Sequence, residues 1–228
     1  MTEIKIKDKT IEIKKDSIYN IIRKYATDNN VLDIGCAGNS YEKGKTPRPE
    51  SWLHGHINKY AKRCIGLDID KEEVELLNSL GYNCIFQNAE EPFELDKKFD
   101  VIFTLYVIYY LDPVVVLNNV KRHLKEGGYF IVDAPNAFYY KRFLNYLLKK
   151  KNPSYFGSSI CLYDPKTMCN LLIKHGFEIS EIYWVYFKKS NSPWSFLLNK
   201  FKEKWDYFEA RFLVVAKNRN TENKYQNG

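Results

Sequence analysis

Polar residues follow three successive short apolar segments, each at the point where the segment ends. Asp33 lies beside Gly35 and Gly38, Asp68 closes the second segment, and Asn88 follows the third. A carboxylate can accept hydrogen bonds from both hydroxyl groups of a ribose, and an amide can pair with the edge of an adenine. Glycine lets the backbone approach a ligand closely. Singly, these residues fit a turn glycine, a helix-capping aspartate and a loop asparagine; together they predict a cofactor containing adenosine.

The residues around the glycine turn favour one cofactor chemistry over another. A dinucleotide-binding turn has the pattern G-x-G-x-x-G, and counting from Gly35 puts Ala37 and Ser40 where glycines belong. The Asp33 carboxylate would repel a pyrophosphate, but it suits a cationic ligand. S-adenosylmethionine has an ammonium and a sulfonium group and no phosphate, so the turn favours this cofactor.

Regular alternation of strands and helices must position these residues. Short apolar strands are expected at 31–34, 64–67, 83–88, 100–105 and 129–133, and two late strands at 179–187 and 212–217. Helices are expected at 17–26 and 51–63 and after the capping residues Asp70, Asp112 and Asp164. This order predicts a single α/β domain with a doubly wound, mostly parallel seven-stranded sheet, in which the late pair forms an antiparallel hairpin at one edge. The alternating residues 4–13 predict a small hairpin or an extended arm.

The motifs in this order resemble those of the class I (Rossmann-like) S-adenosylmethionine-dependent methyltransferases over about residues 28–187. The segment from Val31 to Gly38 resembles their first motif, and Gly66-Leu67-Asp68-Ile69 resembles the acidic motif after their second strand. Asn88-Ala89-Glu90 is similar to the third motif, where the family usually has aspartate. The segments 99–103 and 124–128 resemble the fourth-strand motif and the Gly-Gly turn before the fifth strand.

The resemblance implies an enzyme that uses S-adenosylmethionine and releases S-adenosylhomocysteine. It places Asp33 near the methionine amino group, Asp68 on the ribose, and Asn88 with Ala89 at the adenine. The full set of expected cofactor-binding residues is Asp33, Gly35, Cys36, Ala37, Gly38, Asp68, Ile69, Asn88, Ala89 and Leu105. No metal is expected. The turn departs from the usual G-x-G-x-G of the family, since Gly35, Ala37 and Asn39 stand there with an extra Gly38.

Catalytic candidates are His56, His54 and Tyr110, with Tyr109 and Asp133 as further possible bases. Many relatives have a histidine in the segment that matches 109–111, where this chain has Tyr110, so no base can be transferred from the family. An imidazole titrates near neutral pH and a phenol does not, which ranks the histidines first. His54 and His56 are two residues apart, so at most one should point into the site.

The acceptor pocket should come from the parts outside the shared motifs: residues 1–26, 41–52 and 135–163. We expect a methyltransferase domain at 1–218, with an N-terminal arm and helix at 1–26, an acceptor-side cover at 136–163, and a disordered tail at 219–228. Pro135-Asn136 resembles methyltransferases that act on small metabolites, quinones and sugars. The Asn/Asp-Pro-Pro-aromatic motif of base-amine methyltransferases is missing after the fourth strand.

These features predict methyl transfer to a small-molecule or glycan acceptor, most readily to oxygen. The alternatives are an inactive methyltransferase-like binding protein and an RNA-directed methyltransferase, the latter because the net charge is +7. Nucleic acid is thus a possible but not a favoured partner, and the oligomeric state stays open. The longest apolar segment, 101–111, is too short to span a bilayer. Five cysteines without a Cys-x-x-Cys pattern indicate reduced, cytoplasmic thiols rather than disulfides or a zinc site.

Overall fold

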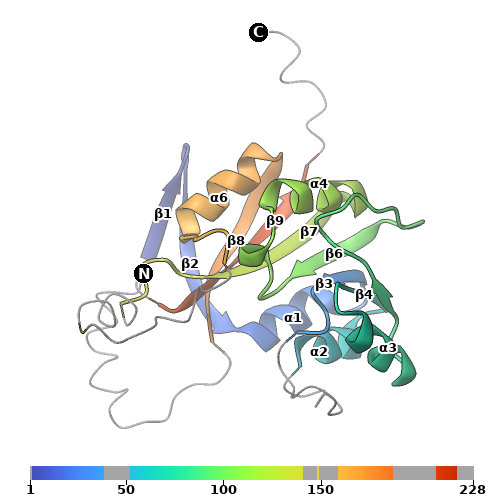
Figure 1. Cartoon of the computed structure of the whole chain (residues 1–228). Helices are drawn as coiled ribbons and strands as arrows, with labels where there is room; N and C mark the ends of the chain where they lie inside the picture. The colour runs from blue at the N-terminus through green and yellow to red at the C-terminus, as the bar shows by residue number, and fades with distance from the viewer. Residues whose placement is uncertain (1, 39–51, 141–147, 149–158, 187–208, 220–228) are drawn as a thin grey trace.

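A single mixed sheet organises the part of the chain that the computed structural model describes, which is residues 2–38, 52–140, 148, 159–186 and 209–219 (Figure 1). Its nine strands are β1 (Thr2–Ile6), β2 (Lys9–Ser17), β3 (Asn30–Ile34), β4 (Arg63–Asp68), β5 (Cys84–Phe86), β6 (Phe99–Thr104), β7 (Leu124–Pro135), β8 (Phe177–Tyr186) and β9 (Arg211–Asn218). The helices within these ranges are α1 (Ile18–Ala26), α2 (Leu53–Tyr60), α3 (Lys71–Ser79), the single 3₁₀ turn η1 (Ile108–Tyr110), α4 (Pro113–His123) and α6 (Pro165–Lys174).

The strand order places a topological switch point in the middle of the sheet. The order is β1-β2-β8-β9-β7-β6-β3-β4-β5, with β3 parallel to both β4 and β6. The chain runs outward from β3 to β4 and β5, and then returns to the other side of β3 as β6. In such a sheet, ligands bind beyond the carboxyl ends of the strands where the order reverses. A ligand-binding site is therefore expected at the segments that follow β3, β4 and β6.

The predicted α/β class is confirmed, but the prediction of seven strands was wrong. The N-terminal residues, expected as a hairpin or an arm, form β1 and β2 and extend the sheet, because β2 pairs in parallel with β8 (Ile13 opposite Ile182). Ile4, Ile6 and Ile13 are buried and belong to the main core. Strands β8 and β9 are antiparallel, as expected. They do not form the edge, because β1 and β2 cover that side.

Helices cover both faces of the sheet, with α1, α2 and α3 on one face and α4 and α6 on the other (Figure 1). The helix starts follow the sequence signals: the side chains of Asp70, Asp112 and Asp164 accept hydrogen bonds from first-turn amides. Strand β3 alternates between the two layers, since Leu32 joins the core under α4 and Val31 joins the core under α1. Asp33 therefore faces the layer that contains α2.

Some expectations fall on segments that are not described. The cover expected at 136–163 lies largely in 141–147 and 149–158, and the tail expected at 219–228 lies almost wholly in 220–228; both are outside the described residues. Within the ranges that are described, no helix combines the length and the apolar character needed to cross a bilayer.

Candidate active site

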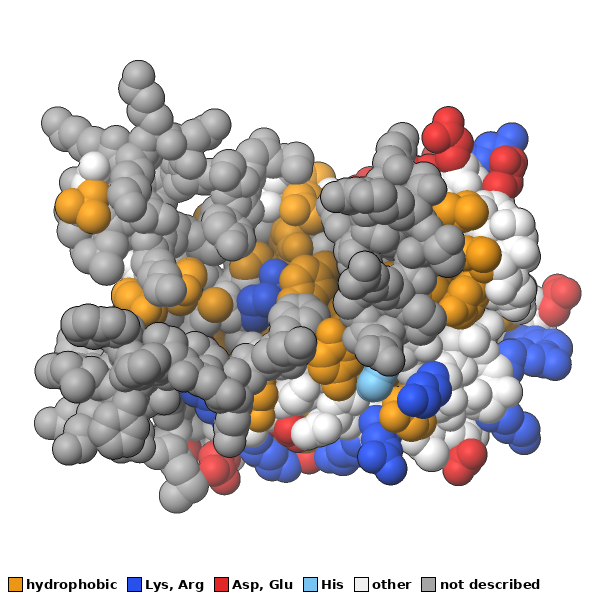
Figure 2. Space-filling model, turned by 90° about the horizontal axis from the view of Figure 1, so that it is seen from below, with side chains coloured by type: hydrophobic (Ala, Val, Ile, Leu, Met, Phe, Trp, Pro, Cys, Tyr) orange, Lys and Arg blue, Asp and Glu red, His pale blue; other side chains and the backbone are white. Residues whose placement is uncertain are grey.

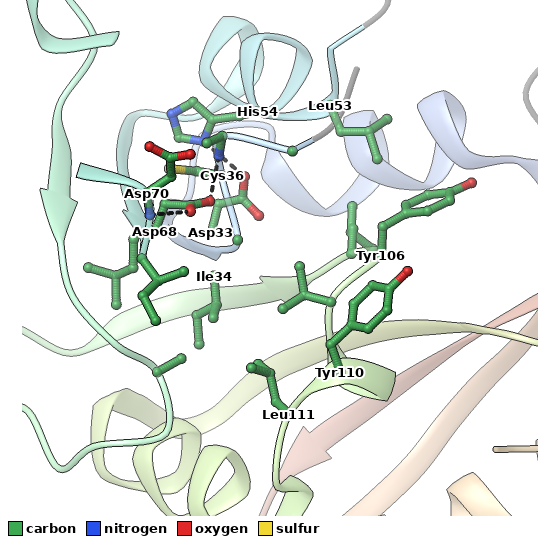
Figure 3. Close-up of a pocket in the computed structure, with 18 of the residues that line it drawn as sticks. Asp33, Ile34, Cys36, Leu53, His54, Asp68, Asp70, Tyr106, Tyr110 and Leu111 are labelled. Atoms are coloured by element: carbon green, nitrogen blue, oxygen red, sulfur yellow. Dashed lines mark hydrogen bonds and ion pairs between the residues drawn. The ribbon is translucent and has the colours of Figure 1, made fainter. Parts of the chain in front are cut away.

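A cavity of about 1020 Å³ lies beyond the carboxyl ends of β3, β4 and β6 (Figure 3). This volume is at the upper end of the usual range for small-molecule sites, so the cavity has room for a cofactor and a second small molecule. All ten residues expected to bind the cofactor line it, together with His54 and Tyr110. Their individual contacts with the cofactor stay predictions.

The turn after β3 is held close to two neighbouring segments. The amides of Gly35 and Cys36 donate to the carbonyl of Leu67 at 2.7 and 3.1 Å. Gly35 has a φ of +85°, and a Cβ at this position would lie 2.1 Å from Cγ2 of Val107. Only glycine fits both the conformation and the space. The turn therefore passes tightly between β4 and the segment that follows β6.

The Asp68 carboxylate connects the turn to the start of α3. Its Oδ2 accepts from the amide of Ala37 at 2.9 Å, and its Oδ1 accepts from the amide of Asp70 at 3.0 Å. Burial raises the pKa of Asp68 above its ordinary value, against the effect of backbone amides that favour the charged form. A carboxylate has about four acceptor positions and the amides of Ala37, Ile69 and Asp70 occupy three, so Asp68 can still accept a hydrogen bond from a ligand in the cavity.

Asp33 and His54 form a buried ion pair in the wall of the cavity. Nδ1 of His54 lies 2.9 Å from Oδ2 of Asp33, and the two side chains are 1% and 5% exposed. Burial by itself would lower the pKa of His54. The hydrogen bond to Asp33, with contributions from Cys64 and Cys84, nevertheless holds this pKa well above its ordinary value. His54 is therefore a cation that neutralises and orients Asp33. Sequence reasoning identified both residues but did not pair them.

The other two catalytic candidates are placed very differently. His56 does not line the cavity: its Nε2 lies 3.3 Å from the carbonyl oxygen of Tyr19, and its ring packs against Tyr19 and Tyr60. Burial lowers the pKa of His56. Tyr110 lines the cavity and is 39% exposed. Of the two histidines, only His54 points towards the site, which agrees with their spacing on one helix.

The end of the cavity opposite Asp68 contains an arginine that sequence reasoning missed. Arg211, at the start of β9, donates from Nε and Nη2 to Oδ2 of Asp133 at 2.8 and 2.6 Å. The guanidinium lies 3.6 Å from the ring centroid of Tyr106, whose amide donates to Oδ1 of Asp133 at 2.6 Å. Tyr106 has a φ of +67°, which is unusual for a residue with a side chain. The one available signal in the sequence was a cation at the start of the otherwise apolar segment 211–216.

The charges of the cavity suit a cationic cofactor that carries adenosine. Asp33, Asp68, Asp70 and Glu73 line its cofactor end. Among the described lining residues, Arg211 is the sole lysine or arginine, and it is paired with Asp133. The other cation of this lining, His54, is paired with Asp33, so neither is left to neutralise a pyrophosphate. Figure 3 shows the acidic groups on one side of the cavity and the rings of Tyr106 and Tyr110 on the other.

Comparisons with known proteins agree with this chemistry. A family model described as a methyltransferase domain matches residues 13–182. The uncharacterized methyltransferase YcgJ of Bacillus subtilis (strain 168) is 31% identical over 144 residues, which are 58% of this chain and 52% of that protein. The chain thus spans about half the length of this curated relative.

Solved structures show the same fold at low sequence identity. The N-methyltransferase NodS of Bradyrhizobium japonicum WM9, in complex with S-adenosylhomocysteine, superimposes with a TM-score of 0.54 at 14% identity, covering 88% of this chain and 85% of that one. An S-adenosylmethionine-dependent methyltransferase of Mesorhizobium loti gives 0.59 at 14% identity, with 88% and 95% covered. Because the family model spans most of the chain and the cavity fits its cofactor, this chain belongs to the class I S-adenosylmethionine-dependent methyltransferases and uses S-adenosylmethionine.

Proposed function

We propose that the enzyme transfers a methyl group to an oxygen atom of a small polar metabolite or a sugar. The observation that carries this proposal is the wall of tyrosines opposite the cofactor end of the cavity, formed by Tyr106, Tyr109 and Tyr110 beside Arg211. Tyrosine offers an apolar face and a hydroxyl group, which suits a compact acceptor with several hydroxyl groups. Methylation of nitrogen is the second outcome that we consider.

Alignment carries most of the catalytic effect in this proposal. S-adenosylmethionine, when bound, supplies a strongly electrophilic methyl group, so the protein has mainly to orient the acceptor and exclude water. Burial raises the pKa of Tyr109 to about 12, against the effect of the nearby Arg211. Tyr109 therefore keeps its proton at neutral pH and donates a hydrogen bond to an acceptor oxygen. The solvent-accessible Tyr110 supplies a second hydroxyl at the mouth of the cavity.

Neither histidine fits the role of general base that the sequence suggested. His54 is held protonated by Asp33, so it has no lone pair for an acceptor proton at neutral pH. His56 faces the backbone of Tyr19 and lies outside the cavity lining. We therefore assign His54 to positioning Asp33 and leave His56 out of the reaction.

The distribution of the basic residues that the structure describes favours a small acceptor over RNA. On the face in Figure 2, most of the coloured lysine and arginine side chains lie along the border and are mixed with acidic ones, and one basic side chain lies among hydrophobic ones near the centre. Several described lysines are paired with carboxylates far from the cavity, for example Lys9 with Glu178, Lys14 with Glu181 and Lys125 with Asp100. A nucleic-acid methyltransferase would instead be expected to carry a continuous basic stripe beside the cofactor.

A screen of sugars and polar metabolites with methyl-labelled S-adenosylmethionine tests the proposed acceptor class. We expect label in at least one hydroxyl-bearing compound, and mass spectrometry of the product to place the methyl group on oxygen. Label in RNA alone would contradict the proposal. Binding of the cofactor without transfer to any member of a broad panel would instead favour the inactive, binding-only alternative.

The reducing cytoplasm is the location we propose, because all five cysteines are free thiols.

Changing Tyr110 to phenylalanine should weaken acceptor binding more than it slows transfer. One lost hydrogen bond of about 1 kcal/mol corresponds to a roughly fivefold higher KM for the acceptor, with kcat changed less. His56→Ala is the control, with steady-state kinetics close to those of the unmodified enzyme and the same pH–rate profile. A fall in kcat of roughly 10²-fold or more in Tyr110→Phe would reveal a general base and contradict alignment.

Changing Asp68 to alanine should weaken S-adenosylhomocysteine binding by about 1.5–3 kcal/mol, measured by calorimetry. The reason is the loss of a charged acceptor for the ribose hydroxyls, together with the loss of the link between Ala37 and Asp70. Asp96→Ala removes an exposed carboxylate outside the cavity and is the matched control. Equal affinities in the two variants would remove Asp68 from the cofactor site.

A further inference from the structure

Three cysteines surround the inner side of His54, where the cofactor turn meets β4 and β5. The thiols of Cys36 and Cys84 are 3.8 Å apart, sulfur to sulfur. Nε2 of His54 lies 3.8 Å from the sulfur of Cys84, and its Nδ1 lies 4.0 Å from that of Cys64. All three thiols are buried. Figure 3 shows Cys36 and His54 side by side at the cofactor end of the cavity.

Strand register explains why these groups meet. Asp33 in β3, Gly66 in β4 and Cys84 in β5 are direct neighbours across three parallel strands. A Cβ on Gly66 would lie 2.5 Å from the sulfur of Cys36 and 2.9 Å from Cε1 of His54. The missing side chain therefore leaves the space in which Cys36 and His54 reach Cys84. A glycine at position 66 is therefore needed for the contact between the two thiols.

The thiols of Cys36 and Cys84 differ in their tendency to lose a proton. Cys36 donates its S–H hydrogen bond to the sulfur of Cys84. This bond, with a further contribution from His54, lowers the pKa of Cys84 to about 6, although burial opposes the shift. The same interaction raises the pKa of Cys36 far above its ordinary value. A thiolate thus lies beside a protonated thiol, which is the arrangement that a reactive cysteine and its resolving partner need.

Two plainer explanations fit this cluster less well. Buried cysteines often serve simply as small apolar side chains, but that role requires neither a charged imidazole nor a sulfur–sulfur contact. A metal centre is the other explanation. Within the described part of the chain, no group of three or more His, Cys, Asp or Glu side chains is arranged to hold a metal ion.

We propose that Cys84 and Cys36 form a redox-active thiol pair that hydrogen peroxide converts to a disulfide. The Cys84 sulfur attacks one peroxide oxygen, so that an S–O bond forms, the O–O bond breaks and the departing hydroxide is protonated to water. The Cys36 sulfur then attacks the Cys84 sulfenic acid. The S–S bond forms, the S–O bond breaks, and the leaving hydroxide takes the Cys36 proton as a second water. The two thiols together lose two electrons to the peroxide.

The cavity and the turn connect this chemistry to the cofactor. Cys36 and His54 line the cavity and Cys84 does not, so a small oxidant would have to pass Cys36 to reach the Cys84 sulfur, which lies 3.8 Å from the Cys36 sulfur. A disulfide has an S–S length of about 2.05 Å, so the sulfurs must approach by about 1.7 Å. Cys36 immediately precedes Ala37, whose amide donates to Asp68. The carbonyl of Cys36 accepts a hydrogen bond from the indole of Trp52 at 2.8 Å. Oxidation should therefore distort the cofactor turn and lower cofactor affinity, and bound cofactor should in turn slow oxidation.

The test treats the full-length protein with hydrogen peroxide and then alkylates, digests and analyses it without reduction. We expect free thiols to fall from five to three, a single linked peptide pair containing Cys36 and Cys84, and full reversal by dithiothreitol. Calorimetry with S-adenosylhomocysteine should show at least a tenfold loss of affinity in the oxidised protein. Cys84→Ser should keep the affinity of the reduced protein after the same treatment. Cys161→Ser is the matched control and should still form the linked pair.

Several outcomes would overturn the proposal. Five thiols that persist under peroxide, or a linked pair that includes Cys64 in place of Cys36, would show that the contact is only packing. Overoxidation of Cys84 to the sulfinic acid with Cys36 still free would show that Cys36 does not resolve it. A disulfide that leaves the affinity for S-adenosylhomocysteine unchanged would overturn the coupling to the cofactor turn. Because thiol chemistry and cofactor binding are measured separately, each failure is recognised by itself.

Discussion

Replacing His54 with alanine should lower the free energy of unfolding by about 3–5 kcal/mol, because it leaves the Asp33 carboxylate buried without its partner. Both side chains are almost fully enclosed, at 1% and 5% exposed, so the Asp33 charge is left poorly solvated when the imidazole is removed. The measurement is urea-induced unfolding followed by circular dichroism. His56→Ala, two residues along the same helix and without a carboxylate partner, should lose much less.

A double-mutant cycle with Asp33→Asn distinguishes a real pair from simple loss of packing. If the two groups act together, Asp33→Asn with His54→Ala should cost clearly less than the sum of the single changes. Strict additivity, or a loss below about 1 kcal/mol in His54→Ala, would contradict the buried ion pair. S-adenosylhomocysteine affinity should fall in both single variants, since Asp33 and His54 line the cofactor end of the cavity.

The same pair makes stability depend on pH in a definite direction. The folded-state pKa of His54 is raised, because the hydrogen bonds to Asp33 and the nearby thiols outweigh burial. Its contribution is therefore complete below the unfolded-state pKa of about 6.5 and is lost as pH rises through the folded-state value. The lowered pKa of Cys84 acts in the opposite sense between about pH 6 and 9. The pH series is thus best measured in a Cys84→Ser background, where His54→Gln should reduce the loss of stability with rising pH.

The cofactor end of the site could be predicted from the sequence because its residues are tied to strand ends. Asp33, Asp68 and Asn88 each follow a short apolar run, and the carboxyl ends of neighbouring parallel strands meet at one edge of the sheet. Local patterns also predicted the capping aspartates of the helices. Strand ends and helix caps depend on residues that are close together in the sequence, so they can be predicted from the spacing of residue types along the chain.

The features that the sequence did not reveal depend on contacts between distant segments. Whether 4–13 would stay an arm or join the sheet was decided by β8, some 170 residues further along the chain. The Gly-Gly turn expected before a strand at 129–133 is included in a longer β7, which begins at Leu124 directly after α4. The cysteine cluster required the register of β4 against β5, which has no local signature. For the same reason the sequence did not reveal the role of Arg211, because its partner Asp133 lies 78 residues earlier in the chain.

Removing that arginine is the second large effect that we expect. Arg211→Ala should destabilise the protein by about 3–5 kcal/mol, because Asp133 is fully buried and loses its counter-ion. The guanidinium also packs on the ring of Tyr106 and lies 5.6 Å from the ring centroid of Tyr109. The tyrosine wall should therefore loosen, and the KM for the acceptor should rise more than that for the cofactor. Arg211→Lys keeps the charge but loses the paired donors. Its stability and its KM for the acceptor should therefore lie between those of the unmodified enzyme and those of Arg211→Ala.

The chain contains a control ion pair of equal length in a more exposed environment. Lys15 and Glu209 form an ion pair at 2.6 Å, the same nitrogen-to-oxygen distance as Arg211 and Asp133. The side chains of Lys15 and Glu209 are 51% and 17% exposed, whereas those of Arg211 and Asp133 are 17% and 0% exposed. Lys15→Ala should therefore cost at most about 1 kcal/mol in urea unfolding. Equal losses in Lys15→Ala and Arg211→Ala would show that burial does not set the strength of the Arg211 pair, and its proposed support of the tyrosine wall would fall with it.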